Sequence, residues 1–370
     1  MLTPGLWSYS MNFTLNSWLQ AIEMADVPMY GGLVGLIFHV PMNILFIYKI
    51  GWGYQGAAVA TSTFQILQPL ATLYYLFMTS HGKSRIYHNT GADALTTPIP
   101  FLFDVQRAIY SFKGIIQYLG LALPGIVIIS EWWASEIAIF LSGRLPFPAI
   151  TLATMTIYQS INSTCFMFPV GVSVACSTRV SNLLGARNPT GASLASKVSI
   201  VSAAFVGLAM SSVLTFTPHT FFPSLFTPDS DIIHQASKTL PFLAFYVFAD
   251  GIQYTINGIV KGCGKQCIVM PIVIVAYWIV GLPLAYFLAF QWQHSTKYGI
   301  EGVIGLVAGM TVGTWTHFLL LAVVVGLGTN WEAEVVKAQE RLRFEQDHKK
   351  VSTENEKEIL KMDESQNLID

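Results

Sequence analysis

The run from Leu121 to Gly143 is long enough to cross a lipid bilayer as one helix, yet it carries Glu131 and Glu136 near its middle. About 20 helical residues, each rising about 1.5 Å, span the hydrocarbon core. An acidic side chain at that depth costs roughly 2.5–3.5 kcal/mol on insertion scales, so these acids must face protein or water. No Lys or Arg lies inside the run to pair with them. The pattern indicates a functional site; the alternative is that both acids only pair with a neighbouring helix.

Composition places this run in a polytopic all-α membrane protein. Mean hydropathy is +0.52, 53% of residues are apolar and 11% are charged, whereas soluble domains average about 25% charged residues. Apolar runs predict about nine transmembrane helices, at residues 4–22, 29–48, 55–78, 118–142, 150–175, 196–217, 238–260, 268–290 and 301–327.

The distribution of basic residues predicts the orientation of these spans. Sixteen of the 20 Lys and Arg residues fall on one side, in the loops after spans one, three, five and seven and in the C-terminal tail. Basic residues collect on the cytoplasmic side of membrane proteins, so the tail and the 79–117 loop are expected in the cytoplasm. The first residues lack the basic segment of a cleavable signal peptide.

An internal similarity predicts two lobes. The segment from Leu15 to Ala21 resembles the segment from Ile256 to Gly262, so spans one to three look like spans seven to nine. Parallel repeats of this kind imply a twelve-helix arrangement with two six-helix lobes. The chain is then expected to comprise a partial N-terminal lobe (1–78), an inter-lobe loop (79–117), a complete C-terminal lobe (118–330) and a charged tail (331–370). The tail is expected to begin as a weakly amphipathic helix and to be solvated.

A third acid, Asp250, lies inside the seventh span beside Gln253, Tyr254 and Asn257. It is either part of the same site or a hydrogen-bonding group between packed helices. Aromatic faces attract organic cations, so several aromatic side chains are candidates for a substrate cavity, although core or lipid packing is the alternative for each. These candidates are Trp132, Trp133, Tyr158, Tyr246, Tyr254 and Tyr277, and Gln253 and Asn257 are polar candidates for the same cavity.

Other residues are candidates for helix contacts and motion. Gly171, Gly185, Gly262 and Gly264 are expected to permit close helix contacts or tight turns. Pro169 is a candidate hinge in the fifth span. Arg179, at the cytoplasmic end of that span, is expected either to anchor to lipid headgroups or to make a gating contact.

The remaining motifs argue against other classes. The pair Cys263 and Cys267 lacks a neighbouring His or further Cys, so it is a weak metal signal. No nucleophile–base pair, phosphate-binding glycine loop or basic nucleic-acid patch stands out. We therefore expect no enzyme activity, no cofactor, no metal and no nucleic-acid partner.

Four segments resemble the eukaryotic multidrug and toxic compound extrusion (MATE) transporters. They are Leu121–Gly143, Phe168–Ala186, Gly258–Gln266 and Tyr277–Pro283, and the resemblance runs from about residue 4 to residue 327. It implies helices four to twelve of a twelve-helix fold, with the first three absent. In this family the acids of helices seven and ten bind the coupling cation and shape the substrate site, and Glu131, Glu136 and Asp250 match those positions. Ser160 stands where mammalian members carry a further glutamate.

The resemblance and the buried acids together predict an antiporter that exports organic cations or xenobiotics in exchange for protons. Burial disfavours the charged form of a carboxylate, so a proton and an organic cation would compete for the same acids. Sodium is the alternative coupling ion. Two other functions stay open: a truncated, non-transporting or regulatory relative, and an exporter of organic anions such as citrate. The expected location is the plasma membrane or the vacuolar membrane.

Overall fold

The computed structural model describes residues 3–90, 112–292 and 300–343, and these ranges are helical with no strand. The chain divides into two compact units, Met1–Phe112 and Lys113–Asp370. All nine predicted spans are helical, which confirms the predicted fold class.

The N-terminal unit contains α1 (Thr3–Ala21), α2 (Asp26–Asn43), α3 (Gly53–Met78) and α4 (Ser80–Thr90). The end of α2 continues as the π-helical segment η1 (Ile44–Lys49). Helix α3 packs against both α1 and α2. A small core of Leu19, Met24, Val27 and Leu76 closes one end of this unit.

Helix α4 occupies part of the range predicted as a loop, 79–117. Its Arg85 donates two hydrogen bonds, of 2.7 and 2.8 Å, to the carboxylate of Asp26 at the start of α2. This paired carboxylate raises the pKa of Arg85 above its ordinary value. A polar helix forms here because the bidentate ion pair holds it against the unit, a long-range contact that composition does not reveal.

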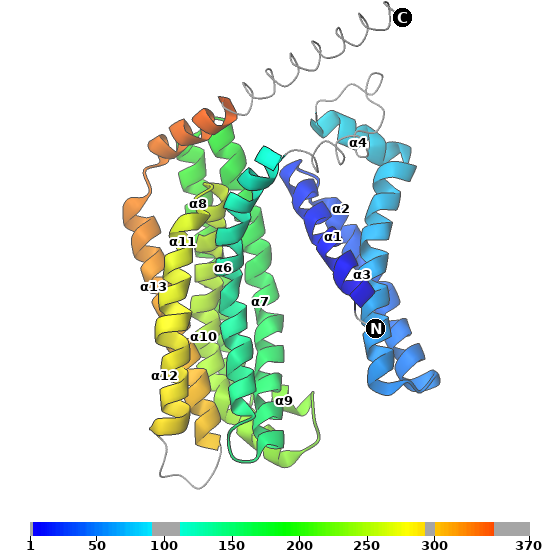
Figure 1. Cartoon of the computed structure of the whole chain (residues 1–370), viewed down its shortest axis with the longest axis vertical. Helices are drawn as coiled ribbons and strands as arrows, with labels where there is room; N and C mark the ends of the chain where they lie inside the picture. The colour runs from blue at the N-terminus through cyan, green and yellow to red at the C-terminus, as the bar shows by residue number, and fades with distance from the viewer. Residues whose placement is uncertain (1–2, 91–111, 293–299, 344–370) are drawn as a thin grey trace, which may run out of the picture. The chain divides into compact units, whose positions relative to one another are not determined.

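The C-terminal unit is a bundle of long helices that run side by side (Figure 1). It contains α6 (Phe112–Ser142), α7 (Pro148–Gly185), α8 (Pro189–Phe216), the short α9 (Phe221–Ser224), α10 (Ser230–Gly262) and α13 (Ile300–Gly328). Between α10 and α13 runs one continuous rod that alternates α-helical and π-helical segments: α11 (Gln266–Val273), η2 (Ile274–Gly281), α12 (Leu282–Tyr286) and η3 (Phe287–Gln291). Helix α10 is the centre of the bundle, because it packs against α7, α8 and α13.

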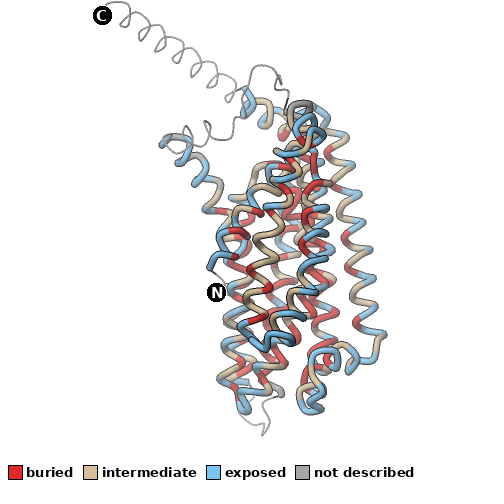
Figure 2. Tube along the Cα trace, turned by 90° about the vertical axis from the view of Figure 1, so that its right-hand side faces the viewer, coloured by how far each residue is buried: buried red, intermediate tan, exposed pale blue. Residues whose placement is uncertain are grey.

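Burial follows this arrangement. Figure 2 shows buried residues recurring along the bundle helices beside exposed ones. In α10 nearly the whole stretch from Ala249 to Val260 is buried, including Asp250, Gln253 and Asn257. A helix buried all round can carry polar residues only if its neighbours satisfy them.

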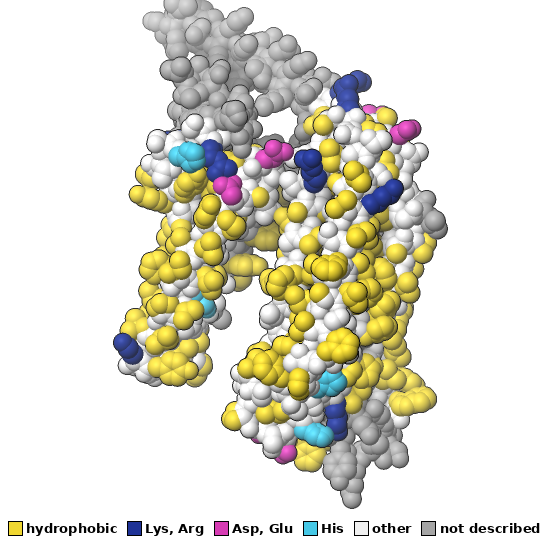
Figure 3. Space-filling view, turned by 180° about the vertical axis from the view of Figure 1, so that it is seen from behind, with side chains coloured by type: hydrophobic (Ala, Val, Ile, Leu, Met, Phe, Trp, Pro, Cys, Tyr) yellow, Lys and Arg dark blue, Asp and Glu magenta, His cyan; other side chains and the backbone are white. Residues whose placement is uncertain are grey.

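The outer surface fits a bilayer. Six segments are long and apolar enough to cross a membrane by length and composition, at residues 26–49, 114–142, 148–185, 189–216, 266–291 and 302–326. On the face in Figure 3, apolar side chains cover the middle of the C-terminal unit, and Lys, Arg, Asp and Glu side chains lie toward its ends. Charged groups avoid hydrocarbon in this way, so the chain is an integral, multi-pass membrane protein.

The two predicted repeats share a packing pattern. In the N-terminal unit, α1 and α2 each pack mainly on α3; in the C-terminal unit, α10 and the rod that begins at α11 each pack on α13. The second member of each trio also contains a π-helical segment. This parallel supports the similarity seen between residues 15–21 and 256–262.

Glycine brings α7 and α10 into contact. A Cβ on Gly258 would lie 2.5 Å from the Ser173 carbonyl oxygen, and one on Gly262 would lie 2.7 Å from that of Ser177. Gly264 has a φ of +67° in the turn after α10. A close helix contact is wrong for Gly171, where an added Cβ would meet nothing within 4 Å. Gly185 also has no such contact, and it ends α7 directly before a turn, in line with the other predicted role.

We expect Gly258→Ala to destabilise the protein by about 1–3 kcal/mol, because the methyl group would push two helix backbones apart. The measurement is the thermal unfolding midpoint in detergent. Gly171→Ala, on the facing helix, is the matched control and should be neutral or slightly stabilising, since Ala is the better helix former. Equal effects of the two substitutions would contradict this account of the α7–α10 contact.

The start of the C-terminal tail is helical over residues 331–343, as predicted, but the expectation that the tail is solvated is wrong for this segment. Trp331, Val335 and Ala338 pack against a cluster at the ends of α7, α8 and α10. Gln339 donates a 2.9 Å hydrogen bond to the carbonyl of Gly185. Arg341 donates one of equal length to the carbonyl of Cys263. The segment is therefore a docked tail helix.

An ion pair fixes this tail helix to the turn after α10. The Lys265 ammonium lies 2.6 Å from a Glu334 oxygen, and the Glu334 side chain is 2% exposed. The adjacent Cys263 is buried here, and burial raises the pKa of its thiol to about 11. Cys263 therefore stays a protonated thiol at neutral pH, while Cys267 is exposed.

We expect Glu334→Gln to loosen the tail helix, because the amide removes the charge that Lys265 pairs with. Hydrogen–deuterium exchange of residues 331–343 should accelerate about tenfold, the equivalent of ~1.4 kcal/mol of local opening. Glu340→Gln, which changes an exposed acid on the same helix, should leave the exchange unchanged.

Candidate functional site

Two of the three predicted acids meet in one pocket inside the C-terminal unit. We call it the acid pocket. Its lining comes from three helices: Glu131, Trp132 and Ser135 of α6, Gln159, Asn162 and Phe166 of α7, and Tyr246 and Asp250 of α10. The space inside admits about one water molecule. No Lys or Arg is among the lining residues of this pocket.

Glu131 is held at the pocket by its own helix and by a neighbouring one. Its side chain is 8% exposed. The preceding residue, Ser130, accepts a 3.0 Å hydrogen bond from the indole N–H of Trp278 in η2. This bond fixes the rotation of α6 about its axis, so that Glu131 faces the bundle interior.

Asp250 begins a chain of buried hydrogen bonds. The Gln253 side-chain amide donates to the Asp250 carboxylate at 2.9 Å and to the Tyr277 hydroxyl oxygen at 3.0 Å. The Tyr277 hydroxyl is in turn 3.1 Å from the Thr314 hydroxyl. This chain ties α10, η2 and α13 together. It gives a buried carboxylate a neutral donor and not a countercharge.

The π-helical segment η2 delivers Tyr277 to this chain. Pro283 lies shortly after η2, at the start of α12, and a proline lacks the N–H that would complete the regular helical ladder. Wider turns of this kind recur at functional sites. Tyr277 itself is 1% exposed.

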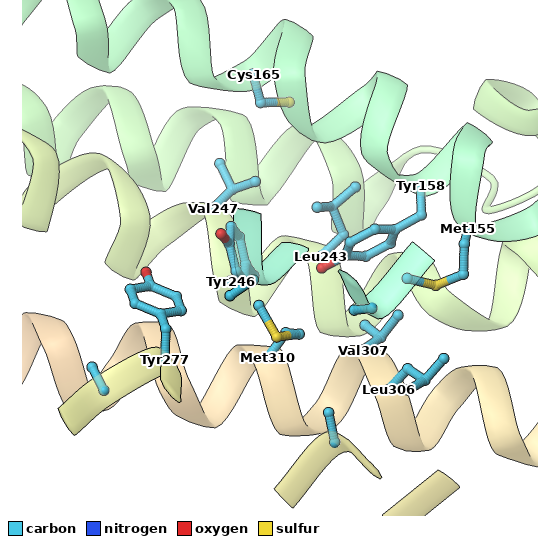
Figure 4. Close-up of a cluster of buried hydrophobic side chains, with 14 of the residues drawn as sticks. Met155, Tyr158, Cys165, Leu243, Tyr246, Val247, Tyr277, Leu306, Val307 and Met310 are labelled. Atoms are coloured by element: carbon cyan, nitrogen blue, oxygen red, sulfur yellow. The ribbon is translucent and has the colours of Figure 1, made fainter. Parts of the chain in front are cut away.

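The aromatic candidates divide into two groups. Trp132 and Tyr254 each pack edge-on against Phe166, with ring centroids 5.0 and 4.6 Å apart. Figure 4 places Tyr158, Tyr246 and Tyr277, from three different helices, in one buried cluster. Tyr158 lines the space next to the acid pocket together with Gln159 and Asn162. Trp133, in contrast, is 52% exposed and does not line either space.

Several other predicted residues lie apart from the acid pocket. Glu136 is exposed on α6, and Arg179 is exposed near the end of α7. Asn257 is 1% exposed, and its side-chain amide has no hydrogen-bond partner in the described part of the chain. Pro169 is buried in α7 next to Gly251, whose added Cβ would meet the proline ring at 3.2 Å. The hinge candidate therefore packs beside the residue that follows Asp250.

The sequence analysis missed His317 of α13. Its side chain is fully buried, and its Nδ1 atom lies 3.5 Å from a Glu131 carboxylate oxygen. The Tyr277 ring meets its ring edge-on at 5.6 Å. The available signal was a lone histidine inside the apolar run 301–327, since ionisable residues within membrane spans are rarely placed there without a role.

Comparison with known proteins agrees with this fold. A sequence model of the MatE family matches residues 125–287. Protein DETOXIFICATION 10 of Arabidopsis thaliana is 30% identical over 96% of this chain and 67% of its own length. Protein DETOXIFICATION 12 of the same plant is 30% identical over 92% of the chain and 66% of its own length. The crystal structure of the eukaryotic MATE transporter AtDTX14 matches with a TM-score of 0.74 at 27% identity, covering 92% of this chain and 70% of that one.

The described helices are long and apolar enough to cross a membrane several times, and two acids are buried inside one helical unit. These features define an integral membrane protein with a polar site in its interior. Within that class, the chain belongs to the MATE family. It spans about two-thirds of the length of the curated relatives it matches.

We expect Tyr277→Phe to destabilise the protein by about 0.6–1.7 kcal/mol, which are the average and the largest value measured for hydrogen bonds between membrane helices. The change removes the hydroxyl that joins Gln253 to Thr314. The measurement is the thermal unfolding midpoint in detergent. Tyr286→Phe serves as the control, because Tyr286 is 45% exposed on the same rod. A larger loss in Tyr286→Phe would contradict the importance of the buried chain.

Proposed function

We propose that this protein is a secondary antiporter that exports organic cations in exchange for protons. The observation that carries the proposal is the acid pocket, in which Glu131 and Asp250 are buried together with aromatic side chains and without Lys or Arg. Two acids in a low-dielectric space favour a positive charge, either a bound proton or a bound cation.

The exchange follows from charge balance. With protons bound in it, the pocket is nearly neutral and holds an organic cation weakly. When the protons leave, the carboxylates attract a cation, and Trp132, Phe166 and Tyr246 supply apolar and aromatic surface against it. A proton and a substrate cation then exclude each other, and exclusion combined with alternating access gives antiport.

The small volume of the acid pocket implies that helices move during transport. Because it admits about one water molecule, an organic cation enters only after α6, α7 and α10 separate. Pro169 is our candidate hinge for α7, because a proline interrupts the backbone hydrogen bonds of a helix. Pro169 lies beside Gly251 of α10.

The orientation is also a proposal. The basic residues at the ends of α7 and α10, together with those of the tail helix, support a cytoplasmic location for that end of the C-terminal unit. Export from the cytoplasm then runs across the plasma membrane or into the vacuole, with protons moving in the opposite direction. Arg179 is our candidate for a contact at this cytoplasmic end.

The test is transport of tetraphenylphosphonium by the full 370-residue chain in liposomes with an imposed pH gradient. We expect Glu131→Gln and Asp250→Asn each to lower the initial rate at least tenfold, because an amide cannot exchange a proton for a cation. Glu136→Gln, an equivalent change at an exposed position five residues along the same helix, is expected to keep most of the rate.

Two further outcomes decide the proposal. Undiminished transport in both Glu131→Gln and Asp250→Asn would refute the role of the acid pocket. Transport that follows a sodium gradient at constant pH would replace the proton by sodium as the coupling ion. Folding of each variant is checked by its elution from a size-exclusion column and its thermal midpoint.

A further inference from the structure

His317 occupies the interior of the C-terminal unit at a position that demands an explanation. Its side chain is fully buried, and neither ring nitrogen has a hydrogen-bond partner in the part of the chain that the structure describes. The nearest charged atom is the Glu131 Oε2 oxygen, 3.5 Å from Nδ1, and that oxygen also lacks a hydrogen-bond partner there. Two unsatisfied polar groups thus face each other in a space removed from water.

The surroundings of His317 leave Glu131 as its closest ionic partner. From η2, Tyr277 presents its ring to the imidazole, and its hydroxyl is engaged by Gln253 and Thr314. From α10, Asp250 accepts a hydrogen bond from Gln253, Tyr246 lines the acid pocket, and Lys261 interacts electrostatically with Glu131. From α7, Tyr158 contributes a neutral phenol.

The two acids therefore differ. Asp250 is satisfied by a neutral amide, whereas Glu131 faces a base that can itself carry a proton. A buried polar group without a partner costs about 1–3 kcal/mol, and an unpaired buried charge costs more. A proton on Nδ1, aimed at the Glu131 carboxylate, gives that ring nitrogen and the Glu131 oxygen a partner through one charge-assisted hydrogen bond. A side-chain rotation that shortens 3.5 Å to about 2.8 Å is enough.

We propose that His317 is the resident cation of the acid pocket and that an organic substrate displaces its proton. This inference rests on the proposed antiport. In the empty pocket, the His317 imidazolium pairs with the Glu131 carboxylate. When an organic cation arrives, it takes over the carboxylate, and its positive charge repels the imidazolium until His317 releases its proton to water. One positive charge enters and one leaves, so the charge beside Glu131 does not change.

This role differs from that of a structural histidine. A histidine needed only for packing would contribute no proton to the number released when substrate binds. A proton-carrying His317 adds one proton to that number. It also makes the affinity for the substrate fall as the pH is lowered, by up to a factor of ten per pH unit, because protons compete with the substrate for the same place.

The experiment measures proton release when tetraphenylphosphonium binds the full 370-residue protein in detergent micelles. Isothermal titration calorimetry at pH 6.5, in buffers of different ionisation enthalpy, gives the number of protons released. His317→Gln keeps a hydrogen-bonding amide near Glu131 but cannot titrate. His234→Gln is the matched control, because His234 is exposed near the start of α10.

We expect the wild type and His234→Gln to release the same number of protons, and His317→Gln to release up to one fewer. The affinity of His317→Gln should also weaken less between pH 7.5 and pH 5.5, by about tenfold relative to the wild type. Equal proton release and equal pH dependence in His317→Gln and the wild type would overturn the proposal. If the wild type itself binds without releasing protons, the proposed proton antiport fails instead.

A second measurement keeps His317 in place and therefore covers the case in which His317→Gln does not fold. A chain in which the other histidines are replaced by Gln, with His317 labelled with ¹⁵N, gives one pair of ring nitrogen signals. We expect an imidazolium signal at pH 6 that converts to neutral imidazole when tetraphenylphosphonium is added. A signal that keeps its protonation state through saturation with the ligand would overturn the proposal.

Discussion

The structure depends on one constraint: the charged and polar side chains inside the C-terminal unit must be kept away from lipid, although they have no full countercharges. Within the C-terminal unit, Asp250, Gln253, Tyr277 and Thr314 are joined by hydrogen bonds across three helices. In hydrocarbon, each of these groups would cost several kcal/mol unless it were paired. The central position of α10 follows from this constraint, because a helix carrying such groups must be surrounded by other helices on all sides.

Helix positions were predictable because the length of an apolar run and the thickness of the bilayer set them. The presence of buried acids was predictable for the same reason, since a carboxylate at mid-span has few alternatives. Which acid faces inward was not. Glu131 and Glu136 are about 140° apart around a helix, and the Trp278–Ser130 hydrogen bond that sets the rotation of α6 joins residues far apart in sequence.

His317 and the docking of the tail helix escaped sequence analysis for a related reason. A lone histidine in an apolar run gives no partner by spacing, because Glu131 lies on a different helix. The tail has the composition of a solvated segment, but one glutamate buried against Lys265 and three apolar residues on one face dock its first part. Tertiary contacts of a few residues thus override what local charge density indicates.

The π-helical turns of η2 have a mechanical consequence. A π-helical turn closes each backbone hydrogen bond over one residue more than an α-helical turn does, so a shift of this turn by one residue would change the register of the side chains within it. Each such step would rotate the side chains it passes by about 100°. Tyr277 lies inside this segment. A one-residue shift of the π-helical turn would therefore rotate the Tyr277 phenol toward or away from Gln253, and the rest of the rod would not need to tilt.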